Sequence, residues 1–462
     1  METTDACMLV RVTTYARRLG LFSATMAVIG GIIGAGIFRG PAVVAARVRS
    51  PGLTLVAWVV GGLIALAGAL CFGELGRRSP RAGGGYVYLR DALGPLPAFL
   101  YGWALLLVIA TGATAAVAVT FAGYAVTLLG LPVGITTHVA VGAIVVLCIV
   151  NYVGVKPASL SLNVLTVLKL GALAALIAVG LWFTPPTAPY RPLAPLTAPA
   201  GAVGVVAALG TALVPILFAY GGWQQTNFIA EEIIAPERNL PRALALGVAG
   251  VVTVYLLANL AYLHALGVAG LAASPAPAAA VMQQALGRPG TRLISVGIAV
   301  STLGFLSLVL LVTPRVFQAM GADGVFFQRL ARLHPVHRTP TGAIVFMGAW
   351  AILLTVSGTY AQLLDYVVFG DWIFFGLTVA TLFVYRARDR AAGMAAPPGA
   401  LRTIGYPWVP GLFVVAAAYV VASSVLANPR NAAIGGGLLL LGVPVYLYWR
   451  FRHKDQAQGW SE

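Results

Sequence analysis

Two glycine-rich breaks inside membrane-length apolar runs constrain this chain more than any other feature. The first break lies within residues 29–38 (IGGIIGAGIF), and the second lies within residues 218–223 (FAYGGW). Inside a bilayer every backbone N–H and C=O needs a partner, so irregular backbone survives only where protein buries it or where it lines a cavity. Broken spans at matching places in two halves of a chain are typical of transporters, which bind substrate between them. We therefore expect a transporter with a substrate site near the middle of the membrane.

The composition places the chain in a bilayer. Hydrophobic residues make up 60% of the sequence and charged residues only 9%, which leaves too few charges to cover a soluble globule. Apolar runs of roughly 20 residues, the length that crosses a bilayer, predict an all-α polytopic membrane protein with about twelve transmembrane helices. We expect one membrane domain over residues 1–462, with spans near 20–45, 53–75, 97–128, 133–153, 161–183, 204–230, 242–267, 291–318, 340–357, 361–385, 406–427 and 432–450.

The net charge of +16 is explained by topology. If the N-terminus is cytoplasmic and the spans alternate, most of the 29 Lys and Arg residues fall in cytoplasmic segments, as the positive-inside rule requires. We expect a multi-pass protein of the plasma (inner) membrane with both termini in the cytoplasm. Membrane lipid is then the partner of the basic segments, and no nucleic acid is expected.

Motifs of other function classes do not occur in the sequence. The five histidines show no metal-ligand spacing, and there is no H-E-x-x-H, Walker A or G-x-S-x-G motif. The three cysteines, Cys7, Cys71 and Cys148, are not placed to form an extracellular disulfide. We expect no metal, no cofactor and no enzymatic activity.

The two breaks have opposite electrostatic polarity. Unwinding at residues 34–36 frees backbone amides at the start of a second half-helix, where these donors and the positive end of the helix dipole suit a carboxylate. Carbonyls near Phe218 and Ala219 end a half-helix and suit an ammonium group, which the Phe218 ring would cover. Glycines also allow close helix packing, the role that we favour for Gly30 and Gly31. Together the two breaks are complementary to the backbone of an α-amino acid.

The same segments resemble a known family. The two breaks, with Asn227, Phe228, Glu231 and Glu232 and then residues 236–242 (PERNLPR), resemble the amino acid/polyamine/organocation (APC) superfamily, most closely its L-type amino acid transporter branch. Further similar segments occur in family order, at residues 83–89 (GGGYVYL), 163–170 (NVLTVLKL) and 320–324 (MGADG). The resemblance implies a LeuT-like 5+5 inverted repeat, at about 20–183 and 204–385, with broken helices 1 and 6 and two additional helices within about 406–450.

The resemblance also assigns substrate contacts. It implies that backbone amides of the first broken helix bind the substrate carboxylate, and that carbonyls of the sixth bind the amino group. The first set of matching positions is Ile33, Gly34, Ala35, Gly36 and Ile37. The second set is Phe218, Ala219 and Gly221, in which Phe218 also matches the gating aromatic of the L-type branch.

Lys169 is an ionisable residue inside an expected span. It lies about eight residues, or roughly 12 Å, from the cytoplasmic end, and charge at such depth is expensive and usually functional. The resemblance implies a lysine in place of a bound sodium ion, anchoring the first and eighth spans with Ser301 and Thr302 as neighbours. Because burial disfavours its charged form, Lys169 could also exchange protons. The alternative is a lysine that snorkels to the cytoplasmic interface.

Arg39, Phe218 and Glu231 are the gate candidates. Arg39 departs from the family pattern, which has a small or apolar residue there. It would attract anionic substrates in an outward vestibule, pair with Asp365 or Asp371, or face lipid headgroups. Glu231 and its neighbour Glu232 would form a cytoplasmic gate or an inert surface, and Glu74 is a weaker candidate of the same kind. The gate partners expected for them are Arg77, Arg78 and Arg90.

These observations favour a secondary transporter of L-amino acids, neutral ones first, that works as an exchanger by alternating access. A proton-coupled symporter is the second choice. Asp365 and Asp371 keep polyamines and cationic amino acids open as substrates. A non-transporting nutrient sensor is the alternative from another class, whereas a channel would need a continuous polar pore lining. The loop after the third span lacks the cysteine that animal light chains carry, so no disulfide-linked accessory subunit is expected.

Overall fold

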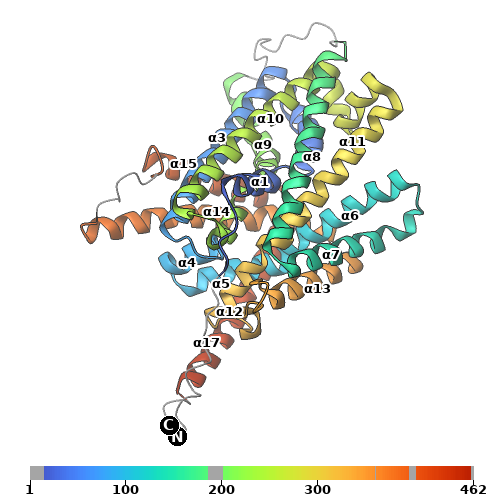
Figure 1. Ribbon diagram of the computed structural model, residues 1–462. Helices are drawn as coiled ribbons and strands as arrows, with labels where there is room; N and C mark the ends of the chain where they lie inside the picture. The colour runs from blue at the N-terminus through green and yellow to red at the C-terminus, as the bar shows by residue number, and fades with distance from the viewer. Residues whose placement is uncertain (1–14, 186–200, 359, 395–401, 459–462) are drawn as a thin grey trace.

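The computed structural model describes residues 15–185, 201–358, 360–394 and 402–458, and over these residues the chain is helical (Figure 1). Extended pairing among them is limited to one parallel bridge between Leu19 and Ile233. The helices are α1 Leu21–Ile32, α2 Gly36–Val48, α3 Pro51–Arg78, α4 Gly85–Leu93, α5 Pro95–Ala104, η1 Leu105–Ile109, α6 Ala110–Leu129, η2 Val133–Ile135, α7 Thr136–Val153, α8 Val155–Trp182, α9 Gly201–Ala219, η3 Trp223–Glu232, α10 Pro236–Ala273, α11 Pro277–Val312, α12 Pro314–Ala322, η4 Gln328–Ala331, α13 Thr341–Ser357, α14 Tyr360–Ala391, α15 Trp408–Ala427, α16 Pro429–Leu440 and α17 Gly442–Gln458.

Helices of membrane-spanning length account for much of the chain. Among the described residues, eight helices are long and apolar enough to cross a membrane, and the bent pair α1 and α2 makes a ninth if it counts as one span. The chain is therefore a polytopic helical membrane protein. Each span expected from the sequence falls on one helix or on consecutive helical elements, which are α5, η1 and α6 for residues 97–128, but the total of about twelve and the inverted repeat stay predictions.

Both breaks lie where the glycines are. Helix α1 ends at Ile32 and α2 begins at Gly36, with a bend of 44° between them. Helix α9 ends at Ala219, and the 3₁₀ helix η3 begins at Trp223, after Gly222 with its φ of 107°. Only a residue without a side chain adopts this last conformation easily.

The two breaks contact each other through backbone. A Cβ added at Gly31 would lie 2.7 Å from the carbonyl oxygen of Gly222, and one added at Gly222 would overlap the carbonyl oxygen of Gly31. A Cβ added at Gly36 would lie 2.9 Å from the Cα of Ala219. Gly31 therefore allows the two broken helices to pack closely, as expected. Gly36, for which we expected ligand contact, allows close packing as well. In Figure 1, α1 lies within the bundle, where α8 and α10 contact it.

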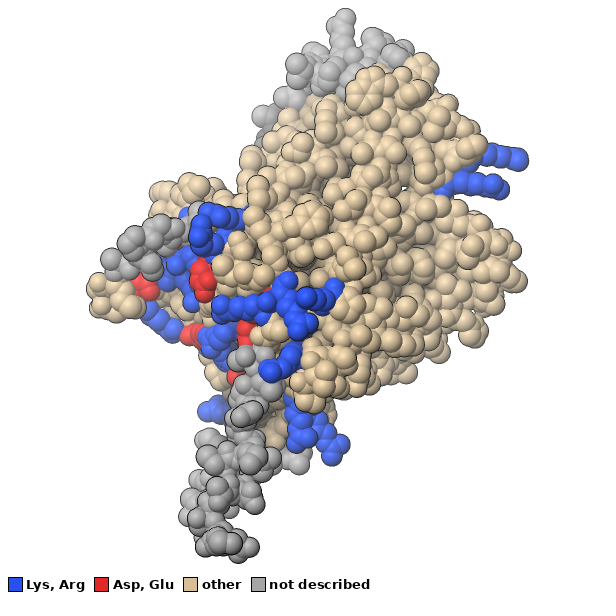
Figure 2. Space-filling view, viewed as in Figure 1, with Lys and Arg blue, Asp and Glu red and all other residues tan. Residues whose placement is uncertain are grey.

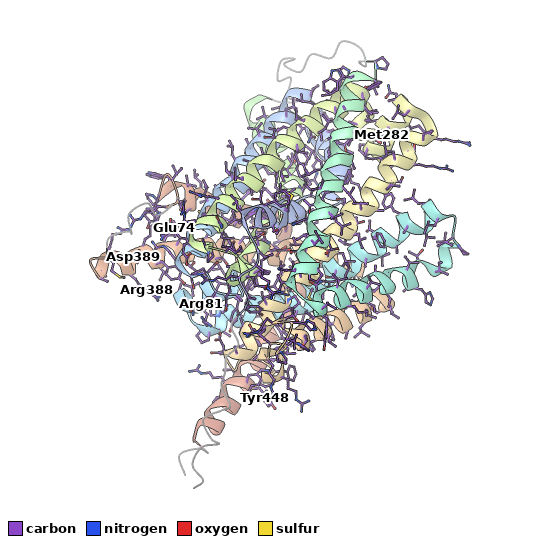
Figure 3. All side chains as sticks on the ribbon, viewed as in Figure 1. Glu74, Arg81, Met282, Arg388, Asp389 and Tyr448 are labelled. Carbon is purple, nitrogen blue, oxygen red and sulfur yellow. The ribbon has the colours of Figure 1, made fainter. Side chains whose placement is uncertain are left out.

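Charged side chains gather at one end of the molecule, as Figure 2 shows. Glu74, Arg81, Arg388 and Asp389 lie together there in Figure 3, far from Met282 at the opposite end. We call this the charged end and define it by the ion-paired residues of α3, α4, α12 and α14. Its ion pairs join Glu74 to Arg78 (3.0 Å) and Arg386 (2.6 Å), Arg78 to Asp389 (2.7 Å), Arg90 to Asp323 (2.5 Å) and Arg81 to Asp91.

Candidate substrate site

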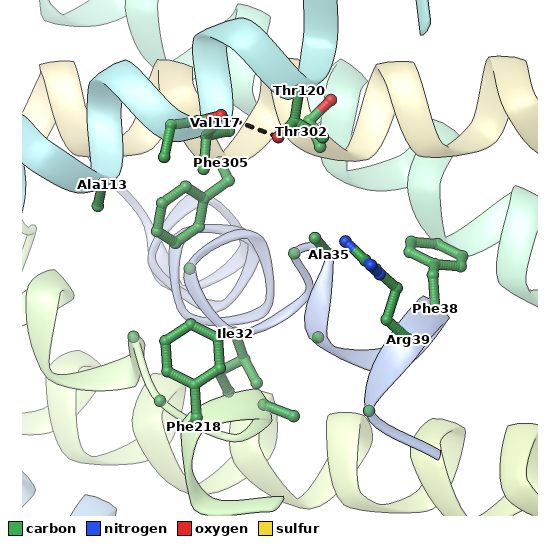
Figure 4. Close-up of a pocket in the computed structure, with 18 of the residues that line it drawn as sticks. Ile32, Ala35, Phe38, Arg39, Ala113, Val117, Thr120, Phe218, Thr302 and Phe305 are labelled. Carbon is green, nitrogen blue, oxygen red and sulfur yellow. Dashed lines mark hydrogen bonds between the residues drawn. The ribbon is translucent and has the colours of Figure 1, made fainter. Parts of the chain in front are cut away.

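A cavity of about 600 Å³ lies between the two breaks (Figure 4). The first break contributes Gly34, Ala35 and Gly36 to its wall, and the second contributes Phe218, Ala219 and Gly221. Six of the eight substrate positions that the sequence indicated thus line one cavity. The remaining wall comes from further residues of the broken helices and from η1, α6, η3, α11 and α14, and it includes Val117, Thr120, Thr302, Phe305, Trp372 and Phe375.

Ile33 and Ile37 are the two expected substrate residues outside the cavity lining. Both side chains are fully buried in the hydrophobic core. Their carbonyls are also engaged, since that of Ile33 accepts hydrogen bonds from Lys169 and Ser301 and that of Ile37 accepts one from the Tyr262 hydroxyl at 3.2 Å. The amide of Ile33 donates to the carbonyl oxygen of Ile29 at 2.9 Å, so of these two residues only Ile37, in the first turn of α2, keeps its amide for the role that the resemblance implies.

Tyr255 of α10 bridges the breaks, a role that the sequence did not indicate. Its buried hydroxyl lies 3.1 Å from the carbonyl oxygen of Ile32 and 3.3 Å from that of Ala219. One hydroxyl therefore meets the last turn of α1 and the last residue of α9. The sequence shows a tyrosine inside an apolar span, where its hydroxyl needs a hydrogen-bond partner. It does not show which carbonyl groups that hydroxyl would contact.

Lys169 of α8 holds the end of α1. Its side chain is 0% exposed, and Nζ donates to the carbonyl oxygens of Gly30 (3.1 Å) and Ile33 (2.8 Å). The Ser301 hydroxyl of α11 donates to the same Ile33 oxygen at 3.3 Å. Lys169 thus does not reach an interface, and the snorkelling alternative does not describe it.

Thr302 has a different position from its neighbour Ser301. Its hydroxyl bonds the carbonyls of Ile298 and Ala299 on its own helix, each at 2.9 Å, and its side chain lines the cavity. The expected grouping of Thr302 with Lys169 is therefore wrong in detail. Thr302 belongs to the substrate cavity, and Ser301 belongs to the lysine anchor.

Arg39 and Asp371 are the two charged residues among the described cavity lining. Arg39 is exposed and Asp371 is half-buried. The structure gives no ion pair between them, so the expected pairing is absent in this conformation, and the side chain of Asp365 lies outside the described residues. The carboxylate and the guanidinium give the cavity no net charge.

Glu231 and Glu232 have other partners than we expected. Glu231 lies within 3.4 Å and 3.3 Å of the backbone amides of Tyr15 and Ala82. Glu232 forms a fully buried ion pair with Arg315 at 2.7 Å. For Glu232 the expected gate pair with an arginine of α3 or α4 is thus wrong, because the fold brings Arg315, at the start of α12, against η3. Glu74, the weaker candidate, does bond Arg78.

No group of three or more His, Cys, Asp or Glu residues that could hold a metal ion occurs in the part of the chain that the structure describes. The cavity wall offers freed backbone, hydroxyls, aromatic rings and one charge of each sign. These groups can bind a zwitterion, but they form no nucleophile–base arrangement.

Comparison with known proteins agrees with this geometry. A family model described as amino acid permease matches residues 19–448. The chain is 32% identical over 456 residues to the large neutral amino acids transporter small subunit 2 of Mus musculus, which covers 95% of this chain and 82% of the relative. It is 31% identical over 459 residues to the b(0,+)-type amino acid transporter 1 of Homo sapiens, covering 98% and 91%. It is 30% identical over 438 residues to the serine/threonine exchanger SteT of Bacillus subtilis, covering 93% and 96%.

Proposed function

The chain belongs to the amino acid permease family, and from this premise we propose that it is a secondary transporter that exchanges neutral L-amino acids across a membrane by alternating access. The observation that carries the proposal is the cavity between the two breaks. There the amino group of a substrate would meet backbone carbonyls of the second break, and its carboxylate would meet backbone amides of the first. The one positive and one negative side chain in the lining favour a substrate without net charge.

Exchange is the mode we favour. A relative of similar length, SteT, is named an exchanger, and Lys169 supplies a built-in cation that holds α1 without any bound ion. A proton-coupled symporter is the second candidate, because the same lysine is a buried titratable group in contact with the first break. Polyamines and cationic amino acids remain the substrate alternatives on account of Asp371.

We further propose how the molecule sits in the membrane. The charged end would face the cytoplasm with both termini, in the plasma (inner) membrane, since basic residues collect there. Its ion pairs would close the cytoplasmic side, while the cavity extends toward Tyr124, five residues before the end of α6, and Ala276, just before the start of α11. Cys71 and Cys148 are free thiols, and Cys7 lies outside the described residues. We propose that the chain works without a disulfide-linked accessory subunit.

Uptake into proteoliposomes tests the proposal. Purified protein is supplied with labelled leucine, serine, lysine and aspartate, with and without unlabelled amino acid inside and with and without a pH gradient. We expect leucine or serine uptake that requires internal amino acid and ignores the gradient. Uptake driven by the gradient would support the symporter, and binding without any flux would support a sensor. No uptake and no binding of any amino acid would contradict the proposal.

Phe218 provides a test of the gate. It is 48% exposed in the cavity wall, and Figure 4 shows its ring and that of Phe305 on opposite sides of the broken helix. We expect Phe218→Ala to raise the half-saturating leucine concentration about 3- to 30-fold, since an aromatic ring over an ammonium group contributes about 0.5–2 kcal/mol. Initial uptake rates over a leucine series measure the effect. Phe22→Ala, which removes a 61% exposed ring from α1 outside the cavity lining, is the matched control; equal losses in both variants would remove Phe218 as a gate.

A further inference from the structure

Arg39 is a charged residue in the cavity wall, and the substrate contacts of the two breaks do not explain its presence there. It lies on the first turns of α2, three residues after Gly36, and its side chain is exposed. Figure 4 shows its guanidinium directed toward Ala35 in the first break. Among the side chains that the structure describes, it forms an ion pair with no carboxylate.

The Arg39 guanidinium is available to an anion. Arginine stays charged at any physiological pH, and the Arg39 side chain is exposed in the cavity wall. The fully buried Arg315, by contrast, is already paired with Glu232. An anionic group of a molecule that enters the cavity can therefore pair with Arg39.

We propose that Arg39 binds the α-carboxylate of the substrate together with the backbone amides of the first break. This inference rests on the proposed function, because it takes an amino acid as the cavity's ligand. The carboxylate is the anion that every amino acid carries, whatever its side chain. The guanidinium fork matches a carboxylate in two-point contact, and the N-terminus of the 13-residue helix α2 adds positive potential at the same place.

The consequence is a demand for a free α-carboxylate. A substrate analogue without this group would lose both the charged fork and the amides of the break. Neutral side chains would be accepted with little discrimination by Arg39, because the guanidinium contacts the part that all amino acids share. The inference thus separates recognition of the amino acid backbone, which includes Arg39, from recognition of the side chain by the walls of α6, α11 and α14.

Competition binding with purified Arg39→Gln tests this role. We expect the affinity for leucine to fall about 10- to 100-fold, as for loss of a charge-assisted contact, and the weak affinity for leucine amide to stay at the wild-type level. Arg39→Lys should recover part of the leucine affinity, because it restores the charge but not the fork. Arg49→Gln, at the other end of α2, where the side chain donates to the Ala46 carbonyl, is the matched control and should bind leucine normally. Unfolding temperatures of all variants show whether each one is folded.

Other outcomes overturn the inference. Equal leucine affinity in wild type and Arg39→Gln would remove Arg39 from the site. A change confined to aspartate, glutamate or lysine would assign Arg39 to the substrate side chain. If Asp371→Asn reproduced the leucine loss and the double variant lost no more, the two charges would act as a pair with each other. If the wild type bound no amino acid at all, the proposed function would fail first and the inference with it.

Discussion

Replacing Lys169 with methionine is expected to abolish amino acid transport and to destabilise the purified protein. Methionine has a similar length and fills apolar space well, so the change removes mainly the ammonium group. The carbonyls of Gly30 and Ile33 then lose their buried donor. Leaving a buried acceptor without its donor costs about 1–3 kcal/mol, and the cost falls on the residues that shape the first break. Uptake by proteoliposomes and the unfolding temperature in detergent measure the two effects.

Lys156→Met is the matched control for this prediction. Lys156 belongs to the same helix, α8, but it is exposed near the helix start, and we expect its variant to transport and unfold like the wild type. Normal transport by Lys169→Met would show that the anchor is dispensable. If Lys169→Met kept exchange but lost accumulation driven by a pH gradient, the lysine would be the proton site of a symporter and exchange would be a partial reaction.

The positions of the breaks, and the part of the cavity lining that they contribute, could be predicted from the sequence. Glycine-rich breaks within an apolar run predict irregular backbone, which a membrane protein tolerates only where protein buries it or where it lines a cavity. Residues 34–36 and Gly221 were therefore conspicuous, and the structure places them in one cavity. Lys169 was conspicuous for the same kind of reason, a charge where charge is costly. These signals are local, and each one can be recognised without knowing which helix lies opposite.

The partners of the charged groups could not be predicted in the same way. Glu232 pairs with Arg315, 83 residues further along the chain, and Glu74 with Arg386, 312 residues away. The sequence suggested Arg77, Arg78 and Arg90 as gate partners, whereas the packing of α12 and α14 decides these two pairs. Tyr255 was missed for the same reason, because its use depends on two carbonyls that only the folded breaks bring together.

The distribution of these contacts suggests how the cavity would open alternately to the two sides of the membrane. The charged end is joined by the ion pairs of Glu74, Arg78, Arg90 and Arg386, whereas the described charges of the cavity lining, Arg39 and Asp371, form no ion pair with each other. The fully buried contacts of Lys169 and Tyr255 hold the breaks themselves. An alternating transporter needs such a division, with a fixed centre and ends that open in turn. Effects of substitutions at the centre should therefore exceed those at either end.

Gly222→Ala is the second substitution for which we expect complete loss of transport. Gly222 has a φ of 107°, a conformation that L residues rarely adopt, and its new Cβ would overlap the carbonyl oxygen of Gly31. Backbone strain of this kind costs about 1–3 kcal/mol. The overlap adds to it because the obstructing atom is backbone, which cannot rotate away as a side chain can.

The two broken helices would have to separate where Gly31 meets Gly222, and the freed amides and carbonyls on either side of the cavity would lose their spacing. Gly250→Ala on α10 is the matched control, since a Cβ there meets nothing within 4 Å and alanine favours a helix by about 1 kcal/mol over glycine. We expect Gly250→Ala to transport normally and Gly222→Ala to bind no leucine, with a lower unfolding temperature. Wild-type exchange by Gly222→Ala would mean that the breaks act independently, and the substrate would then have to be bound by one of them alone.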